Sequence, residues 1–185
     1  MIKLSSEQYE EIKRTVIDTF IEYDIRSIPI SAFEMAIKMG IKVVPYSSMD
    51  KEQLDASLAY SLDGYSLETN SGEWIIYYND FCKNYGRINQ TIMHEIGHFA
   101  MGHTEDGDEE EKEAEAKFFA KYALAPPPLI HNMNSPVNAE TVMMAFDISH
   151  QAAVIACRYY RKWLKYGGIE YTDYEMKMLH LFKIA

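Results

Sequence analysis

Residues 93–103 read Met-His-Glu-Ile-Gly-His-Phe-Ala-Met-Gly-His, and this stretch decides both the expected fold and the expected chemistry. Residues four apart in a helix differ by about 40° around its axis, so His94 and His98 would project from one face and could bind one Zn²⁺ ion. Apolar residues repeat around the histidines with the spacing of a helix: Ile92, Met93, Ile96 and Phe99. The stretch is therefore predicted to be a helix that carries a metal site.

Glu95 follows His94 directly and is the predicted general base. In zinc peptidases, a glutamate at this place in the pattern takes a proton from the attacking water and passes it to the leaving amine. Three polar side chains in an otherwise apolar helix are costly to bury unless they have partners or a metal. We therefore expect a catalytic metal site, and the alternative is a buried structural histidine pair beside a surface Glu95.

A catalytic zinc ion needs a third protein ligand and one open position. His103 follows His98 by five residues, whereas the pattern HExxHxxGxxH requires a histidine six residues on, where Thr104 stands. The third ligand is therefore expected to be a glutamate of the next helix, predicted for the acid-rich segment that ends before Pro126.

Helical geometry favours Glu115 among these acids. Apolar residues follow it at i+3, i+4 and i+7, namely Phe118, Phe119 and Tyr122, so that Glu115 lies on the apolar stripe and needs a cation. Glu111, one turn earlier, is the second choice, as a ligand or as a partner of a histidine. Glu110 and Glu113 align with Lys117 or Lys121. Three acids are expected on a solvated face that also complements the start of the helix: Glu109, Glu110 and Glu113.

Two motifs, MHEIGHFAMGH at 93–103 and EAEAKFFAKYALAP at 113–126, resemble the ImmA/IrrE family of metallopeptidases. The family pattern runs HExGH and then E-A-N-x-F-A-x-x-L-L-M-P, and alignment on the closing proline puts its ligand glutamate on Glu115. Lys117 stands where the family usually has Asn. The resemblance extends to three further segments: residues 27–44, the IYYND at 76–80 and the FDISHQAAVIACRYYRKW at 146–163.

The resemblance implies a zinc-dependent endopeptidase with His94, His98 and Glu115 as ligands. It also implies that the substrate is a helix-turn-helix repressor, often encoded beside the peptidase on a phage or mobile element. One rival is a regulator that keeps the fold but binds DNA or a protein without hydrolysis, and another is a metal-stabilised structural domain. An intact Glu95 favours catalysis, because neither rival needs a general base.

The expected fold class is α+β, that of a zincin-like metallopeptidase with a small sheet. A metallopeptidase core is expected over 1–136 and a helix-turn-helix-like C-terminal subdomain, packed on the core, over 137–185. Helices are predicted over 6–23, 31–39, 89–101, the acid-rich segment, 139–146 and 149–165; a strand is predicted over 41–45, and a meander of two or three strands over 58–78, including 74–78.

The charge of the chain argues against nucleic acid as a partner. The 185 residues include 18 Lys plus Arg and 28 Asp plus Glu, which gives a formal net charge of -10. In the helix-turn-helix-like segment the early positions hold Ala152 and Ala153, and the basic residues Arg158, Arg161 and Lys162 come late. We therefore expect this segment to be a packing subdomain that does not bind DNA.

The sequence also favours a cytoplasmic protein. No signal peptide or membrane helix is predicted, and Cys82 and Cys157 fit no metal or redox spacing, as expected for reduced thiols. Zinc peptidases often add a Tyr or His that stabilises the developing oxyanion. The sequence offers four candidates without ranking them: Tyr78, His103, Tyr122 and His131.

Overall fold

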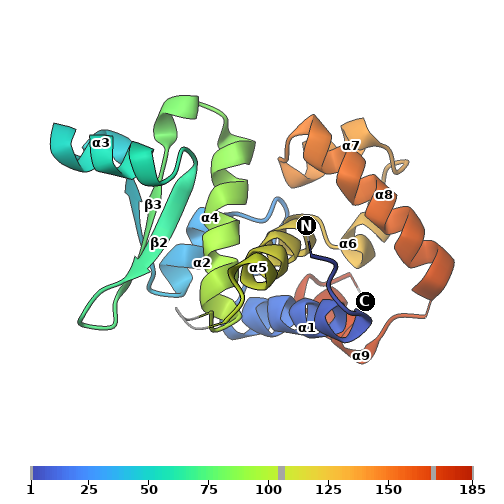
Figure 1. Ribbon diagram of the computed structural model, residues 1–185. Helices are drawn as coiled ribbons and strands as arrows, with labels where there is room; N and C mark the ends of the chain where they lie inside the picture. Colours follow the sequence, from blue (N-terminus) through green and yellow to red (C-terminus); the bar gives the residue numbers. More distant parts are fainter. Residues whose placement is uncertain (1, 104–106, 168–169, 185) are drawn as a thin grey trace.

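The computed structural model describes residues 2–103, 107–167 and 170–184, and the predicted α+β class is confirmed (Figure 1). The strands are β1 (Lys42–Pro45), β2 (Gly64–Glu68) and β3 (Trp74–Tyr78). The helices are α1 (Ser6–Glu22), α2 (Ala32–Lys38), α3 (Lys51–Tyr60), α4 (Tyr85–Ala100), α5 (Glu109–Leu124), α6 (Pro127–His131), α7 (Ala139–Phe146), α8 (His150–Gly167) and α9 (Asp173–Leu181).

The three strands form one sheet in the order β1-β3-β2, in which β3 pairs parallel to β1 and antiparallel to β2. The predicted meander over 58–78 therefore supplies two strands, but its first residues belong to helix α3. A reciprocal cap starts this helix, because the Asp50 side chain accepts from the Gln53 N–H while the Gln53 side chain accepts from the Asp50 N–H. Strand β2 is left at one edge of the sheet.

Helix α4 carries the histidines and begins about one turn earlier than predicted. Its N-cap is Asn84, whose side chain accepts from the Arg87 N–H. Asn89 is buried inside the helix, where its side chain accepts from the Ala32 N–H and donates to the Ile30 carbonyl. The amide of Asn89 therefore ties α4 to the start of α2, because both of its polar atoms are satisfied there.

Helix α4 packs between the sheet and the helices α1 and α5 (Figure 1). Two glycines permit these close approaches. A Cβ on Gly64, at the start of β2, would lie 2.6 Å from the Tyr77 carbonyl oxygen and 2.7 Å from a methyl carbon of Thr91 on α4. A Cβ on Gly97 would lie 3.2 Å from side-chain atoms of Phe119 on α5. Helix α4 therefore packs closely against both the edge strand β2 and helix α5.

The C-terminal helices pack on the rest of the chain. Helix α7 contacts α8, α6 contacts α8 and α9, and α9 contacts α1. Buried residues from both expected units, from Leu4 through Ile92 to Leu179, belong to one hydrophobic cluster. The boundary between residues 136 and 137 stays a prediction. Within the described ranges, none of the helices has the length and apolar character needed to cross a bilayer.

Candidate metal centre

Helix α4 presents two imidazoles side by side. The Nε2 atoms of His94 and His98 lie 3.2 Å apart, and both side chains are partly buried. The opposite side of the helix is held by apolar residues that are fully buried: Ile92, Met93 and Ile96. The amphipathic pattern therefore places the two histidines on one face, as the sequence predicts.

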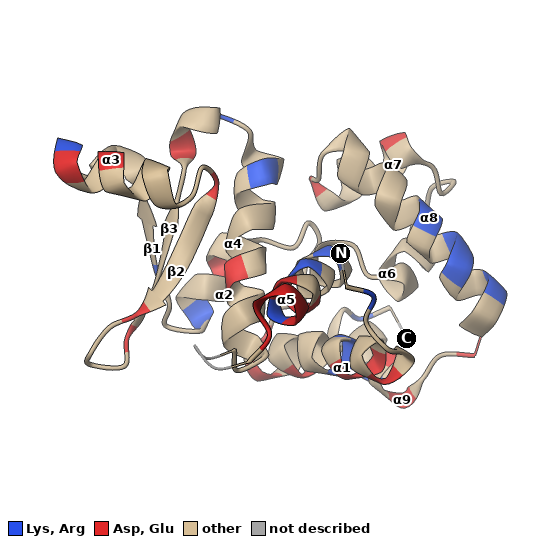
Figure 2. Cartoon of the chain, in the orientation of Figure 1, with Lys and Arg blue, Asp and Glu red and all other residues tan. Residues whose placement is uncertain are grey.

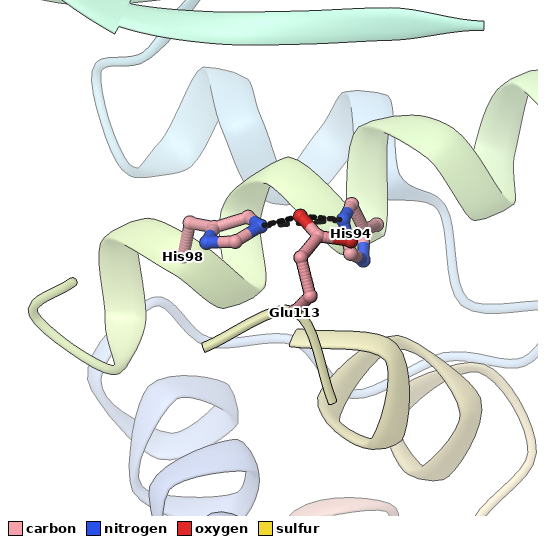
Figure 3. A group of neighbouring side chains, drawn as sticks. All are labelled: His94, His98 and Glu113. Carbon is pink, nitrogen blue, oxygen red and sulfur yellow. Dashed lines mark hydrogen bonds and ion pairs between the residues drawn. The ribbon is translucent and has the colours of Figure 1, made fainter. Parts of the chain in front are cut away.

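Helix α5 adds a carboxylate between the imidazoles. Oε1 of Glu113 lies 3.5 Å from Nε2 of His94 and 3.2 Å from Nε2 of His98 (Figure 3). The other oxygen, Oε2, accepts a hydrogen bond from Nζ of Lys117 at 2.8 Å. Among the described residues, the three side chains form a group that could hold a metal ion.

The spacing of these atoms fits one tetrahedral ion. Bonds of about 2.0–2.1 Å to a tetrahedral zinc place neighbouring ligand atoms roughly 3.3–3.4 Å apart. The three separations between the ligand atoms of His94, His98 and Glu113 are 3.2, 3.2 and 3.5 Å. Two nitrogens and one oxygen supply three of four positions, which leaves the fourth for a water or a substrate.

The protonation of these groups also suits a metal. Burial and the neighbouring His94 lower the pKa of His98 to about 4, so that this imidazole is neutral at pH 7. Burial raises the pKa of Glu113, but the hydrogen bond from Lys117 and the nearby His94 outweigh burial and leave that pKa below its ordinary value. A neutral imidazole and an ionised carboxylate are the forms that bind metal.

Glu95 is 8% exposed and lies against the edge strand β2. The hydroxyl of Ser66 donates to its Oε2 at 2.7 Å. Burial raises the pKa of Glu95 above its ordinary value, while the hydrogen bond from Ser66 and the neighbouring His94 oppose the rise. A carboxylate with a raised pKa is a stronger base than a solvated one, which suits proton transfer near neutral pH.

Removing the Ser66 hydroxyl is expected to shift the pH dependence of activity. Glu95 must be ionised to act as a base, and the hydroxyl stabilises its ionised form. Ser66→Ala therefore raises the pKa of Glu95 further, so that the acid limb of kcat/KM moves to higher pH while the rate above that limb changes little. The measurement is a pH profile of peptide cleavage.

Ser66→Thr is the matched control, because it keeps a hydroxyl donor at the same position. Its acid limb is expected to stay close to that of the parent protein. An acid limb of Ser66→Ala that stays in place, or moves to lower pH, would contradict the role given to this hydrogen bond.

The structure places Glu115 away from the two imidazoles. Its Oε2 lies 2.9 Å from Nε2 of His103, and its Oε1 accepts from Nε2 of Gln8 at 3.2 Å. Glu111 also accepts from Gln8, at 2.6 Å, and contacts neither histidine of the pair in any hydrogen bond or ion pair of the described chain. In the described chain, the carboxylate beside both imidazoles is that of Glu113, and the ligand role of Glu115 stays a prediction.

The reason lies in the two inward faces of α5. At 100° per residue, Glu113 and Glu115 point about 160° apart around the helix axis. In the apolar stripe that starts at Glu115, Phe118 faces α1 and packs edge-on against Tyr9 with ring centroids 4.6 Å apart, while Phe119 lies against Gly97 of α4. Glu113 shares the opposite face with two fully buried small residues, Ala116 and Ala120, and this face reaches the histidines of α4.

The four oxyanion candidates lie in different surroundings. His103 contacts His98 and Glu115. His131 on α6 bonds the Tyr160 hydroxyl through Nδ1, and Tyr78 packs edge-on against Phe33. The buried Tyr122 hydroxyl has no hydrogen-bond partner in the described chain, and it belongs to the face of α5 that points away from Glu113. Of the four, only His103 is joined to the metal site by a hydrogen bond that the structure records.

Sequence reasoning missed two residues of the site. Ser66 carries no local signal, because its role depends on the pairing of β2 with β3 and on the packing of β2 against α4. Glu113 does carry a signal, since Ala116 and Ala120 follow it at i+3 and i+7. Small residues at this spacing mark a face on which another helix comes close.

Comparison with known families agrees with the geometry. The model of the IrrE N-terminal-like domain, peptidase family M78, matches residues 38–158, nearly two thirds of the chain. The matched range contains both α4 and α5, and therefore every residue of the metal centre. No curated protein matches the chain.

Proposed function

Because the chain belongs to the ImmA/IrrE family of metallopeptidases, we propose that it is a zinc-dependent endopeptidase whose ion is held by His94, His98 and Glu113. One observation carries the proposal: three ligand atoms of two helices are spaced as around a single tetrahedral ion, with the buried Glu95 next to one of them in sequence. The donor set of two imidazoles and one carboxylate is typical of catalytic zinc.

A zinc ion held by these residues would polarise the scissile carbonyl and lower the pKa of a water molecule. Glu95 accepts one proton from the attacking water as the new C–O bond forms. It then donates this proton to the amide nitrogen as the C–N bond breaks, so that Glu95 returns to its starting state. Ser66 holds the carboxylate in place through its hydrogen bond to Oε2.

The proposed substrate is a helix-turn-helix repressor encoded near the peptidase. The resemblance of the chain to the ImmA/IrrE family supports this choice. A metallopeptidase requires a protein or peptide substrate. We place the reaction in the cytoplasm, and the free thiols of Cys82 and Cys157 support a reducing compartment.

The rival is a regulator that binds without cleaving. Lys and Arg residues gather along α8, the second helix of the predicted helix-turn-helix, whereas acidic residues crowd the start of α5 (Figure 2). This basic helix is the feature that would favour DNA as a partner. The formal net charge of -10 opposes such binding, because phosphate groups repel an acidic protein.

The decisive experiment joins the chain and the adjacent repressor in one cell. Wild type, Glu95→Gln and Glu110→Gln are expressed with the tagged repressor, and the intact repressor is scored by immunoblot under inducing conditions. Glu110 is exposed near the start of α5, so its variant removes the same charge outside the metal centre. Wild type and Glu110→Gln are expected to cleave, and Glu95→Gln is not.

The same blot separates the rival function. If wild type and Glu95→Gln both leave the repressor whole while both relieve repression, the protein acts by binding. If neither variant cleaves the repressor or relieves repression, the repressor is not its substrate.

A further inference from the structure

Behind the metal centre, a continuous row of hydrogen bonds runs from His98 to helix α1. Nδ1 of His98 lies 3.0 Å from Nδ1 of His103, and Nε2 of His103 lies 2.9 Å from Oε2 of Glu115. Oε1 of Glu115 accepts from Nε2 of Gln8. The His103 and Glu115 side chains are 9% and 16% exposed, so these contacts are largely shielded from water.

The end of helix α4 explains why His103 reaches His98. Gly102 has a φ of +66°, a left-handed conformation that glycine adopts without strain. The His103 N–H donates to the His98 carbonyl and the Gly102 N–H donates to the Phe99 carbonyl, which is the Schellman arrangement at a helix end. The chain therefore folds back, and the ring of His103 packs against the ring of His98 with centroids 5.0 Å apart.

When His103 is neutral, the hydrogen bonds of this row determine which nitrogen of His98 carries the hydrogen. Glu115 accepts hydrogen bonds and cannot donate when it is ionised, so the hydrogen of a neutral His103 must sit on Nε2. Nδ1 of His103 is then an acceptor and takes the hydrogen on Nδ1 of His98. This leaves Nε2 of His98 as a bare lone pair, pointing at the space shared with His94 and Glu113.

The opposite arrangement is unfavourable. If the hydrogen of His98 were on Nε2, then Nδ1 of His103 would have to donate, and a neutral His103 would turn its bare Nε2 toward the Glu115 carboxylate at 2.9 Å. Two acceptors at that distance repel each other. Through a neutral His103, the carboxylate of Glu115 therefore favours the His98 tautomer that carries its hydrogen on Nδ1.

We propose that His103 and Glu115 are a positioning pair, which holds His98 in the tautomer and ring orientation that bind the ion. The inference rests on the proposed zinc site and deepens it, because it gives Glu115 a role behind the ligands. Histidine ligands of metals usually donate their second ring N–H to a carboxylate, a backbone carbonyl or water, and losing that partner typically costs 10- to 100-fold in metal affinity. Here His103, backed by Glu115, stands in that place.

Gln8 holds the far end of the row in place. Its Oε1 accepts from the Ser5 N–H as part of the cap of α1, and its Nε2 donates to both Glu111 and Glu115. Glu111 shares this contact with Gln8 but makes no recorded hydrogen bond to His103. Glu111→Ala is therefore a matched control, since it removes a neighbouring carboxylate without breaking the row to His98.

The experiment measures zinc affinity of the full chain by competition with a fluorescent zinc chelator. His103→Ala and Glu115→Ala are each expected to weaken zinc binding about 10- to 100-fold, and Glu111→Ala is expected to change it little. Glu115→Gln should recover most of the loss, because its amide oxygen still accepts from Nε2 of His103. The double variant His103→Ala/Glu115→Ala should be no weaker than either single variant, since both act through one row.

Imidazole ¹⁵N NMR of the zinc-free chain provides a second readout, independent of metal and activity. The wild type is expected to carry the His98 hydrogen on Nδ1, and His103→Ala is expected to show a mixture of both tautomers. His103→Asn, whose side-chain oxygen can accept from Nδ1 of His98, should restore the wild-type tautomer. A merely structural role of His103 would leave this tautomer unchanged.

The outcomes separate this inference from the proposed function. If wild type takes up no zinc, the proposed zinc site fails. If wild type binds zinc and either His103→Ala or Glu115→Ala, both folded by circular dichroism, binds it equally well, the positioning pair is refuted. If Glu115→Ala abolishes zinc binding as completely as Glu113→Ala does, Glu115 is a ligand, and the inference is again refuted.

Discussion

Glu95→Gln is expected to lower kcat for peptide cleavage by about 10²- to 10⁴-fold, the range that a general acid–base group contributes. The amide keeps the shape of the side chain and can still accept the hydrogen bond from Ser66. It cannot take a proton from water, so the chemical step fails while the fold and the metal site remain. Zinc content and thermal unfolding should match the wild type.

The control for this prediction is Glu110→Gln, which changes the charge by the same amount at an exposed position of α5. Its kcat is expected to stay within about twofold of the wild type, as is usual for surface substitutions away from the site. If Glu95→Gln cleaves peptide at the rate of this control, Glu95 is not the general base and the HExxH motif has a structural role.

Glu113→Ala is expected to lower zinc affinity more than His103→Ala or Glu115→Ala does. It removes the only carboxylate that the described structure places beside both imidazoles. The loss of zinc affinity should exceed the 10- to 100-fold that typically follows removal of a residue hydrogen-bonded to a metal ligand. At zinc concentrations near 100 times the wild-type Kd, binding stabilises the wild type by about 2.7 kcal/mol and raises its Tm by roughly 5–10 °C.

The measurement is therefore Tm with and without zinc, for Glu113→Ala beside Glu115→Ala. Glu113→Ala should show no zinc-dependent shift, whereas Glu115→Ala should show a reduced shift that recovers at higher zinc. Loss of the shift in Glu115→Ala, with the shift intact in Glu113→Ala, would give Glu115 the ligand position and contradict the observed geometry.

The sequence predicts the α+β class and the metal helix because these depend on local patterns. Ile92, Met93 and Ile96 recur with helical spacing and are all fully buried. The predicted start of this helix, at residue 89, is wrong by about one turn, because tertiary contacts and not the local pattern decide the role of Asn89. Asn89 is used instead to bond the backbone at Ile30 and Ala32.

The choice between Glu113 and Glu115 shows what the pattern of one helix cannot predict. The apolar stripe below Glu115 correctly indicates an inward face, because Phe118 and Tyr122 are buried. A helix packed on two sides has two such faces, and hydrophobicity does not tell which one meets the histidines. Glu113 reaches them from the face with small residues, where α5 lies close to α4.

Contacts between distant segments account for the rest of the site. Ser66 meets Glu95 only because β2 pairs with β3 and Gly64 lets the strand approach α4. The spacing of His103 from His98 argues against a ligand role, and in the structure its ring packs against the ring of His98. Its contact with Glu115 joins a residue just beyond the end of α4 to a residue within α5.

The most direct test is a diffraction measurement on crystals of the zinc-loaded protein, at wavelengths on both sides of the zinc absorption edge. The account predicts one strong anomalous peak per chain, about 2.0–2.2 Å from Nε2 of His94, Nε2 of His98 and a carboxylate oxygen of Glu113. Glu115 should remain on His103. A peak bonded to Glu115 in place of Glu113, or no peak between the two imidazoles, would contradict the account.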